Sequence, residues 1–330
     1  MKSRNKYFDF LRGISILMVV AIHTMPNISG YNSVLNSISL VLRQVMNCAV
    51  PLFLAISGYF VSKKTFNCHS DISRFWRKQI PRVYIPMLVW SIGWFFLSMF
   101  QLHNISDAII KIGMLITGGF SVYYFVALII QCYMILPLLV KHKWGGVTIC
   151  IIASFVSISI TSYYINIEGR SFPLILYAGP VYLWIVFFML GIYISKFPDK
   201  QYLRYGCIIS VVGLILQVIE SNYLLDNFGT GIGIKVSSFV FSSGIILSLM
   251  SQQAQNTFKM SKSIRIIAWI GEISFGIYLI HTYCIAALNK VINNDNWILM
   301  WLFTLLLTLT VVIVMKKIVP ASILKKYFGF

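Results

Sequence analysis

Long apolar stretches alternate with short polar ones along almost the whole chain. A helix that spans a bilayer needs about 20 consecutive apolar residues, and windows of that length predict ten such helices. The predicted spans are residues 8–26, 38–61, 82–101, 122–140, 145–165, 174–195, 204–221, 235–251, 266–288 and 297–316. Because the connections are short, the pattern predicts an all-α integral membrane protein. We expect a single bundle of about ten helices forming one domain, residues 1–330, without an additional soluble domain.

The basic residues are distributed unevenly between alternate connections. Most lysines and arginines fall at the two ends of the chain and in every second connection, including residues 62–81. The opposite side carries only a few, namely Arg43, Lys111, Arg170, Lys235 and Lys290. Cytoplasmic loops carry an excess of Lys and Arg, so both termini and the loop 62–81 are predicted to be cytoplasmic. Residues 102–121 and 222–234 are then expected to be short external loops.

Composition supports a membrane protein and narrows the classes of ligand. Of the 330 residues, 58% are hydrophobic and 11% are charged, whereas soluble proteins are roughly 45–50% apolar and 25% charged. The net charge of +18 follows from the loop bias and therefore does not indicate nucleic acid. The six cysteines have no paired spacing, and no set of ligand-type side chains predicts a metal site.

Three ionisable side chains interrupt the first predicted span. Asp9, Arg12 and His23 lie in an otherwise apolar run, and ionisable residues at membrane depth are costly enough to suggest a function. At about 100° per residue, Arg12 and His23 point the same way, roughly 16 Å apart along the helix axis. Asp9 lies one turn before Arg12, close enough to pair with it. The alternative is that Asp9 and Arg12 anchor a helix end at the lipid headgroups and that His23 is an interfacial histidine.

Three further segments place polar residues beside apolar ones. In the second span, Ser57 precedes Gly58, which either permits close helix packing or leaves a gap that admits a ligand. Before the third span, a group of cations is either ordinary cytoplasmic charge or a site for a polyphosphate: Arg74, Arg77, Lys78 and Arg82. In the ninth span, Ser274, Tyr278 and His281 share one helix face, and a lone histidine there is more often structural than catalytic.

Taken together, these segments resemble acyltransferase family 3, a family of multi-span membrane enzymes. The resemblance covers most of the chain and rests first on Arg12, followed after ten residues by His23. The other segments that carry it are VPLFLAISGYF with Ser57 and Gly58, RKQIPRVYIP with Arg82 four residues before Pro86, YYFVALIIQCYMILPLL with Tyr124, and SFGIYLIHT with Tyr278 and His281. The chain departs from the family pattern at Tyr124, where tryptophan is common, and its basic motif is more widely spaced than usual.

The resemblance implies an activity and roles for these residues. Family members transfer acyl groups, usually acetyl, from cytoplasmic acyl-coenzyme A to a hydroxyl of an envelope glycan or small molecule. The residues expected to be catalytic are His23, Arg12 and Asp9, and Arg12 is also expected to be part of the coenzyme site. The expected substrate-binding residues are Ser57, Arg77, Lys78, Arg82, Tyr124, Tyr278 and His281. His23 would act as a general base or as a transient acyl carrier, and the sequence leaves both open.

The resemblance also implies partners and a location. Acetyl-CoA is expected as the acyl donor, with no tightly bound cofactor and no metal. The other expected partners are a lipid-linked or surface glycan and membrane lipids, in a bacterial cytoplasmic (inner) membrane, without nucleic acid. The oligomeric state stays open. Two alternatives remain: a transporter or flippase for a lipid-linked glycan or small molecule, and a family member that acts on an amino acid.

Overall fold

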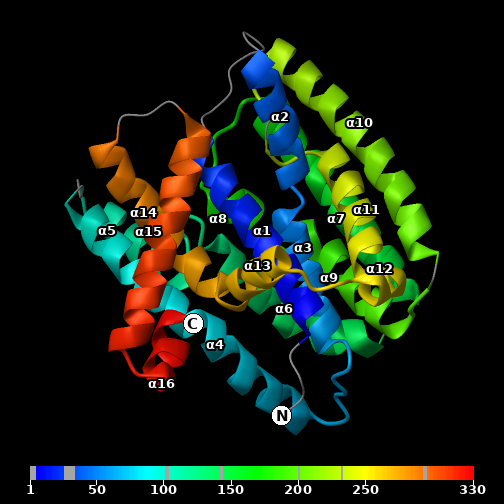
Figure 1. Ribbon diagram of the computed structural model, residues 1–330, viewed down its shortest axis with the longest axis horizontal. Helices are drawn as coiled ribbons and strands as arrows, with labels where there is room; N and C mark the ends of the chain where they lie inside the picture. The colour runs from blue at the N-terminus through cyan, green and yellow to red at the C-terminus, as the bar shows by residue number, and fades with distance from the viewer. Residues whose placement is uncertain are drawn as a thin grey trace. The chain divides into compact units, whose positions relative to one another are not determined.

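The computed structural model (Figure 1) describes residues 5–25, 34–100, 104–141, 144–199, 201–231, 233–292 and 296–330. Every regular element in these ranges is a helix, which confirms the all-α prediction. The chain folds into two compact units, each assembled from separate stretches of sequence. Unit 1 comprises residues 1–64, 139–171 and 182–272, and unit 2 comprises residues 65–138, 172–181 and 273–330.

Unit 1 is built from membrane helices that approach one another closely. Its helices are α1 (Lys6–Thr24), α2 (Val34–Met46), α3 (Ala49–Val61), α7 (Trp144–Ser162), the π-helix η1 (Tyr163–Ile167), α9 (Val181–Lys196), α10 (Tyr202–Phe228), α11 (Val236–Met250), α12 (Gln252–Thr257) and α13 (Lys262–Glu272). Helices α10 and α11 lie side by side (Figure 1). A Cβ on Gly213 of α10 would come within 2.5 Å of the Phe241 nitrogen on α11. Small residues thus let two backbones meet, as is common for helices in lipid.

Unit 2 is organised around one long helix. Its elements are α4 (His69–Met99), α5 (Ile105–Thr117), α6 (Tyr124–Lys141), α8 (Leu174–Ala178), α14 (Ser274–Val291), α15 (Trp297–Ile318), α16 (Ala321–Ile323) and the π-helix η2 (Leu324–Phe328). With 31 residues, α4 is longer than a bilayer crossing requires, and it contains Pro81 and Pro86. Helix α14 is tied to α4 because the Tyr283 hydroxyl accepts from the Trp94 backbone nitrogen at 3.0 Å.

The lengths and composition of the helices identify a multi-pass membrane protein. Six helical segments in the described residues are long and apolar enough to cross a bilayer: residues 6–24, 37–61, 69–99, 146–167, 202–228 and 297–318. A seventh is added if α13 and α14, which break at Ile273, count as one broken span. Helices α6, α9 and α11 contribute three shorter apolar stretches. The count of ten, the single domain and the cytoplasmic termini stay predictions.

Several predicted boundaries were wrong. Residues 102–121 were expected to form a loop but contain α5, which starts at the Asn104 cap and ends at Gly118, where φ is +75°. The predicted loop 62–81 is also shorter, because α4 begins at His69. Similarly, α10 continues through the predicted loop 222–234 as far as Phe228. Hydropathy windows detect the stretch buried in lipid, whereas capping residues set where a helix begins and ends.

Candidate functional site

The first helix holds the ion pair that its spacing predicts. The Asp9 carboxylate is completely buried, and its Oδ1 lies 3.1 Å from Nη1 of Arg12. The Arg12 side chain is 27% exposed, and its guanidinium carbon lies 5.0 Å from the centre of the Phe60 ring. A buried carboxylate is tolerated only with hydrogen bonds or a counter-charge, and Arg12 contributes both. The pair therefore leaves Arg12 as the member that a ligand can reach.

His23 lies in the last turn of the same helix. Helix α1 runs without a break from Lys6 to Thr24, so it preserves the predicted spacing between Arg12 and His23. The His23 side chain is exposed, in contrast to the buried Asp9. The carbonyl of Ile22, the preceding residue, accepts a hydrogen bond from the Arg43 guanidinium on α2. An exposed imidazole thus sits at a helix end that a second helix holds in place.

The region around Ser57 and Gly58 on α3 is closely packed. A Cβ on Gly58 would come within 2.1 Å of the Phe188 carbonyl oxygen on α9, so the backbone of α9 fills the space beside this glycine. The close-packing interpretation of Gly58 is therefore correct. The half-buried Ser57 donates its hydroxyl to the Phe53 carbonyl one turn earlier, at 2.9 Å. Any ligand at Ser57 would have to compete with or share this bond.

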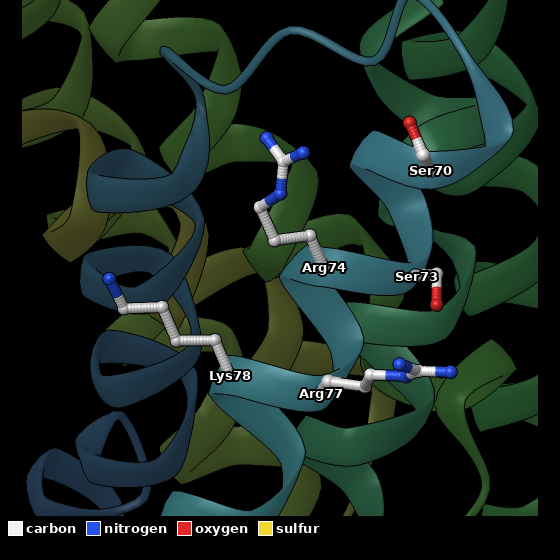
Figure 2. A pocket seen from close by; sticks show the side chains of 5 residues that line it. All are labelled: Ser70, Ser73, Arg74, Arg77 and Lys78. Carbon is white, nitrogen blue, oxygen red and sulfur yellow. The ribbon is translucent and has the colours of Figure 1, made fainter.

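In unit 2, the first turns of α4 form a basic pocket (Figure 2). It has a volume of about 410 Å³ and is lined by Ser70, Ser73, Arg74, Arg77 and Lys78. In the view of Figure 2, Arg77 and Lys78 extend to opposite sides of the helix. Arg82 is exposed one turn further on and is not among the lining residues. The structure thus brings three of the four cations predicted as a polyphosphate site, Arg74, Arg77 and Lys78, into one pocket.

The basic pocket carries one acidic neighbour, Asp71. Oδ1 of Asp71 lies 3.8 Å from Nη1 of Arg74, and its Oδ2 accepts from the Asn67 backbone nitrogen at 3.2 Å. These groups lie before the predicted span 82–101. The Cys68 thiol and the Asn67 amide hold the pKa of the Asp71 carboxyl below its ordinary value. The lining residues nevertheless keep an excess of positive charge at a helix N-terminus, an arrangement that suits phosphate.

The sequence did not identify Ser70 and Ser73 as lining residues. The hydropathy pattern places them in the predicted loop 62–81, and in a loop their spacing from Arg74 and Arg77 carries no information. Once α4 starts at His69, steps of three and four residues place these hydroxyls and guanidinium groups along one stripe of the helix. An Asp in the first turn, here Asp71, was the available signal for the earlier start.

Tyr278 and His281 meet on α14, where both are buried. The Tyr278 hydroxyl donates to the Val122 carbonyl at 2.5 Å, and the Tyr123 hydroxyl donates back to the Leu279 carbonyl at 2.6 Å. Nδ1 of His281 lies 2.7 Å from the Tyr278 carbonyl oxygen. A carbonyl only accepts, so His281 carries its proton on Nδ1. These bonds to backbone link α14 to the start of α6, where Tyr124 is half-buried.

The predicted site residues therefore fall into local groups. Asp9, Arg12, His23 and Ser57 belong to unit 1, and the others, Arg77, Lys78, Arg82, Tyr124, Tyr278 and His281, belong to unit 2. In the described part of the chain, no three His, Cys, Asp or Glu side chains are grouped so that they could hold a metal ion. The candidate functional features are thus a buried ion pair, an exposed histidine and a basic pocket.

Comparison with known proteins places all of these residues within one family match. A family model described as an acyltransferase domain matches residues 5–317. The chain is also similar to the serine/alanine racemase of Enterococcus gallinarum, with 24% identity over 338 residues. That alignment covers 93% of this chain but 45% of the racemase, so the chain spans less than half the length of this curated relative. No solved structure matches the chain.

Proposed function

The chain belongs to acyltransferase family 3, and from this premise we propose that it is a membrane-bound O-acetyltransferase. The proposed donor is cytoplasmic acetyl-CoA, and the proposed acceptor is a hydroxyl of a lipid-linked or surface glycan at a bacterial cytoplasmic membrane. The observation that carries the proposal is the family match over residues 5–317, which includes every predicted site residue. The ion pair and the basic pocket supply the charges that such a donor needs.

The proposed role of His23 follows from the chemistry of acyl transfer. A hydroxyl attacks a thioester efficiently when a base removes its proton and positive or hydrogen-bonding groups stabilise the tetrahedral oxyanion. An imidazole suits the first task because its ordinary titration lies near physiological pH. The exposure of His23 is compatible with access by a hydroxyl or a thioester. It would act as general base or carry the acyl group for part of the cycle.

The proposed donor site uses the basic residues. Coenzyme A carries a diphosphate and a further phosphate, and guanidinium groups bind such groups through two parallel hydrogen bonds. We assign the phosphates to the basic pocket of Arg74, Arg77 and Lys78, with Arg82 nearby. Arg12 contacts the donor, and Asp9 orients Arg12 through the ion pair.

A second candidate function is action on an amino acid. The racemase relative is named for serine and alanine, and its alignment covers 93% of this chain. Serine carries a hydroxyl, so it could take the place of the glycan as acyl acceptor without any change in the proposed donor chemistry. The two candidate functions therefore differ in which product carries the acyl group, the glycan or serine.

The test is transfer of label from acetyl-labelled coenzyme A in membranes that contain the protein. Label is measured in the lipid-linked glycan fraction and in free serine, together with thioester consumption. We expect glycan label with the unaltered protein and none with His23→Ala, while the neighbouring Thr24→Ala keeps activity. Label in serine would favour the second candidate. Absence of thioester consumption with a panel of acyl donors and acceptors would contradict the acyltransferase proposal and favour a transporter.

A further inference from the structure

The end of α1 that carries His23 is held by a side chain from α2. The Arg43 guanidinium donates to the carbonyl of Ile22, one of the last four carbonyls of α1. The carbonyls of a helix's last turn are generally left without an intrahelical N–H partner, and a cation at a helix C-terminus is favourable. Arg43 therefore caps the turn on which His23 lies. Its own position depends on how α2 is held.

Next to Arg43, Gln44 lies at the centre of a buried polar network. Nζ of Lys235 donates to Gln44 Oε1, to the Ser221 hydroxyl at 3.0 Å and to the Gly231 carbonyl at 2.8 Å. Nε2 of Gln217 donates to both the backbone oxygen and Oε1 of Gln44, each at 3.0 Å. We call these five residues, Gln44, Gln217, Ser221, Gly231 and Lys235, the Lys235 network. Their bonds join α2 to α10 and to the residue that precedes α11.

The Lys235 network holds helices together at a large cost in desolvation free energy. The side chains of Gln44, Gln217, Ser221 and Lys235 are all completely buried, and the direct acceptors of the ammonium are neutral. Burying a charge is unfavourable unless every hydrogen bond is made, and helices in lipid can pack through small residues alone. The pairing of α10 with α11 uses such close approaches, since a Cβ on Gly213 would come within 2.5 Å of the Phe241 nitrogen. What the network adds is a fixed register for α2, and Arg43 is the residue beside its centre.

We propose that the Lys235 network is a positioning device: it fixes α2 so that Arg43 holds the turn of α1 carrying His23. The proposal rests on the proposed role of His23 in acyl transfer. Arg43 and Lys235 act here through other residues, so both are positioning residues. Loss of Lys235 should therefore weaken the contact of Arg43 with the end of α1 and make that turn less ordered.

Hydrogen–deuterium exchange in nanodiscs tests this coupling without any assay of activity. We expect Arg43→Gln to increase exchange in the peptide that covers residues 20–25. Lys235→Met should increase exchange there and also in α2. The control, Arg170→Gln, removes an arginine that pairs with Glu168 at 2.6 Å and should change neither region. Ser221→Ala removes one acceptor of Lys235 and gives a milder form of the same pattern should Lys235→Met fail to fold.

Kinetics then separate positioning from general loss of structure. Arg43→Gln should lower turnover about 10-fold, as expected for one hydrogen bond from a charged donor, with donor affinity unchanged and partial rescue by Arg43→Lys. The double variant with Lys235→Met should be no slower than the slower single variant, because both changes act on the same contact. Unchanged exchange at residues 20–25 in Arg43→Gln would overturn the positioning proposal even if turnover fell. The expected exchange pattern without acyl transfer by any form would support positioning and contradict the acyltransferase proposal.

Discussion

Asp9 and Arg12 form an ion pair across one turn of α1, with Oδ1 and Nη1 3.1 Å apart. The two partners differ in access, because Asp9 is completely buried whereas 27% of the Arg12 side chain is exposed. A ligand that approaches this helix therefore meets the guanidinium and not the carboxylate. Asp9 influences a bound ligand through Arg12, by fixing its orientation and offsetting its charge.

This asymmetry predicts unequal effects of the two neutral substitutions. Arg12→Gln removes the counter-charge of a buried carboxylate and should lower the free energy of unfolding by about 1–3 kcal/mol, less than for a fully buried pair because Arg12 is partly exposed. Asp9→Asn should cost less, because the remaining guanidinium can still reach solvent. Thermal unfolding in detergent measures both. A larger loss in Asp9→Asn than in Arg12→Gln would contradict this account.

The double variant Asp9→Asn with Arg12→Gln separates stability from donor binding. Neither charge remains, so stability should recover relative to Arg12→Gln alone. If Arg12 contacts the donor, affinity for acetyl-CoA stays low in the double variant despite the recovered stability. Recovery of donor affinity together with stability would instead mean that Arg12 only supports the fold.

A close crossing between α1 and α13 predicts a second, purely structural effect. A Cβ at Gly271 of α13 would lie 1.8 Å from the backbone oxygen of Asp9, so Gly271→Ala forces the two backbones apart. We expect a loss of about 1–3 kcal/mol in the free energy of unfolding, as for other overpacked sites. Gly113→Ala on α5 is the matched control, because a Cβ there meets nothing within 4 Å. Equal stability of both variants would show that this crossing is not tight.

Features that depend on one helix could be predicted from the sequence. The Asp9–Arg12 pair follows from a spacing of three residues, and the grouping of Tyr278 with His281 follows in the same way. The break at Ile273 and helix α5 could not be predicted from apolar windows, because hydropathy averages do not register caps or turns. The Lys235 network depends on bonds between residues as far apart as 44 and 235, and such contacts are set by packing of distant segments.

The basic pocket predicts a charge-specific loss of donor affinity. Arg77→Ala and Lys78→Ala should each weaken acetyl-CoA binding about 10-fold, because each removes a charged hydrogen-bond donor to phosphate. The matched control is Lys317→Ala, an exposed lysine at the end of α15 predicted to face the same side of the membrane. Titration of donor binding at low and high salt provides the measurement, and the difference between variants and unaltered protein should shrink in high salt.

The turnover of saturated enzyme provides an independent check on the pocket. If Arg77 and Lys78 only bind donor phosphates, saturating donor should restore most of the turnover in both variants. A loss of turnover that saturating donor does not restore would place these residues in the chemical step. The same loss in Lys317→Ala would assign the effect to general surface charge.

The acidic neighbour of the pocket predicts a gain of affinity. Asp71 lies 3.8 Å from Arg74 and competes with any anion for that guanidinium, so Asp71→Asn should strengthen acetyl-CoA binding by roughly two- to five-fold, the range of an exposed ion pair. Because the pKa of the Asp71 carboxyl is held below its ordinary value, the group stays ionised across the neutral range. The gain should therefore be constant between about pH 8 and pH 5 and should disappear only in more acidic solution, where the unaltered protein loses the same charge.

Asp199→Asn removes an acidic group in another connection predicted to be cytoplasmic, and it should leave donor affinity unchanged. Weaker binding by Asp71→Asn would mean that this carboxylate supports the pocket's geometry more than it opposes the ligand.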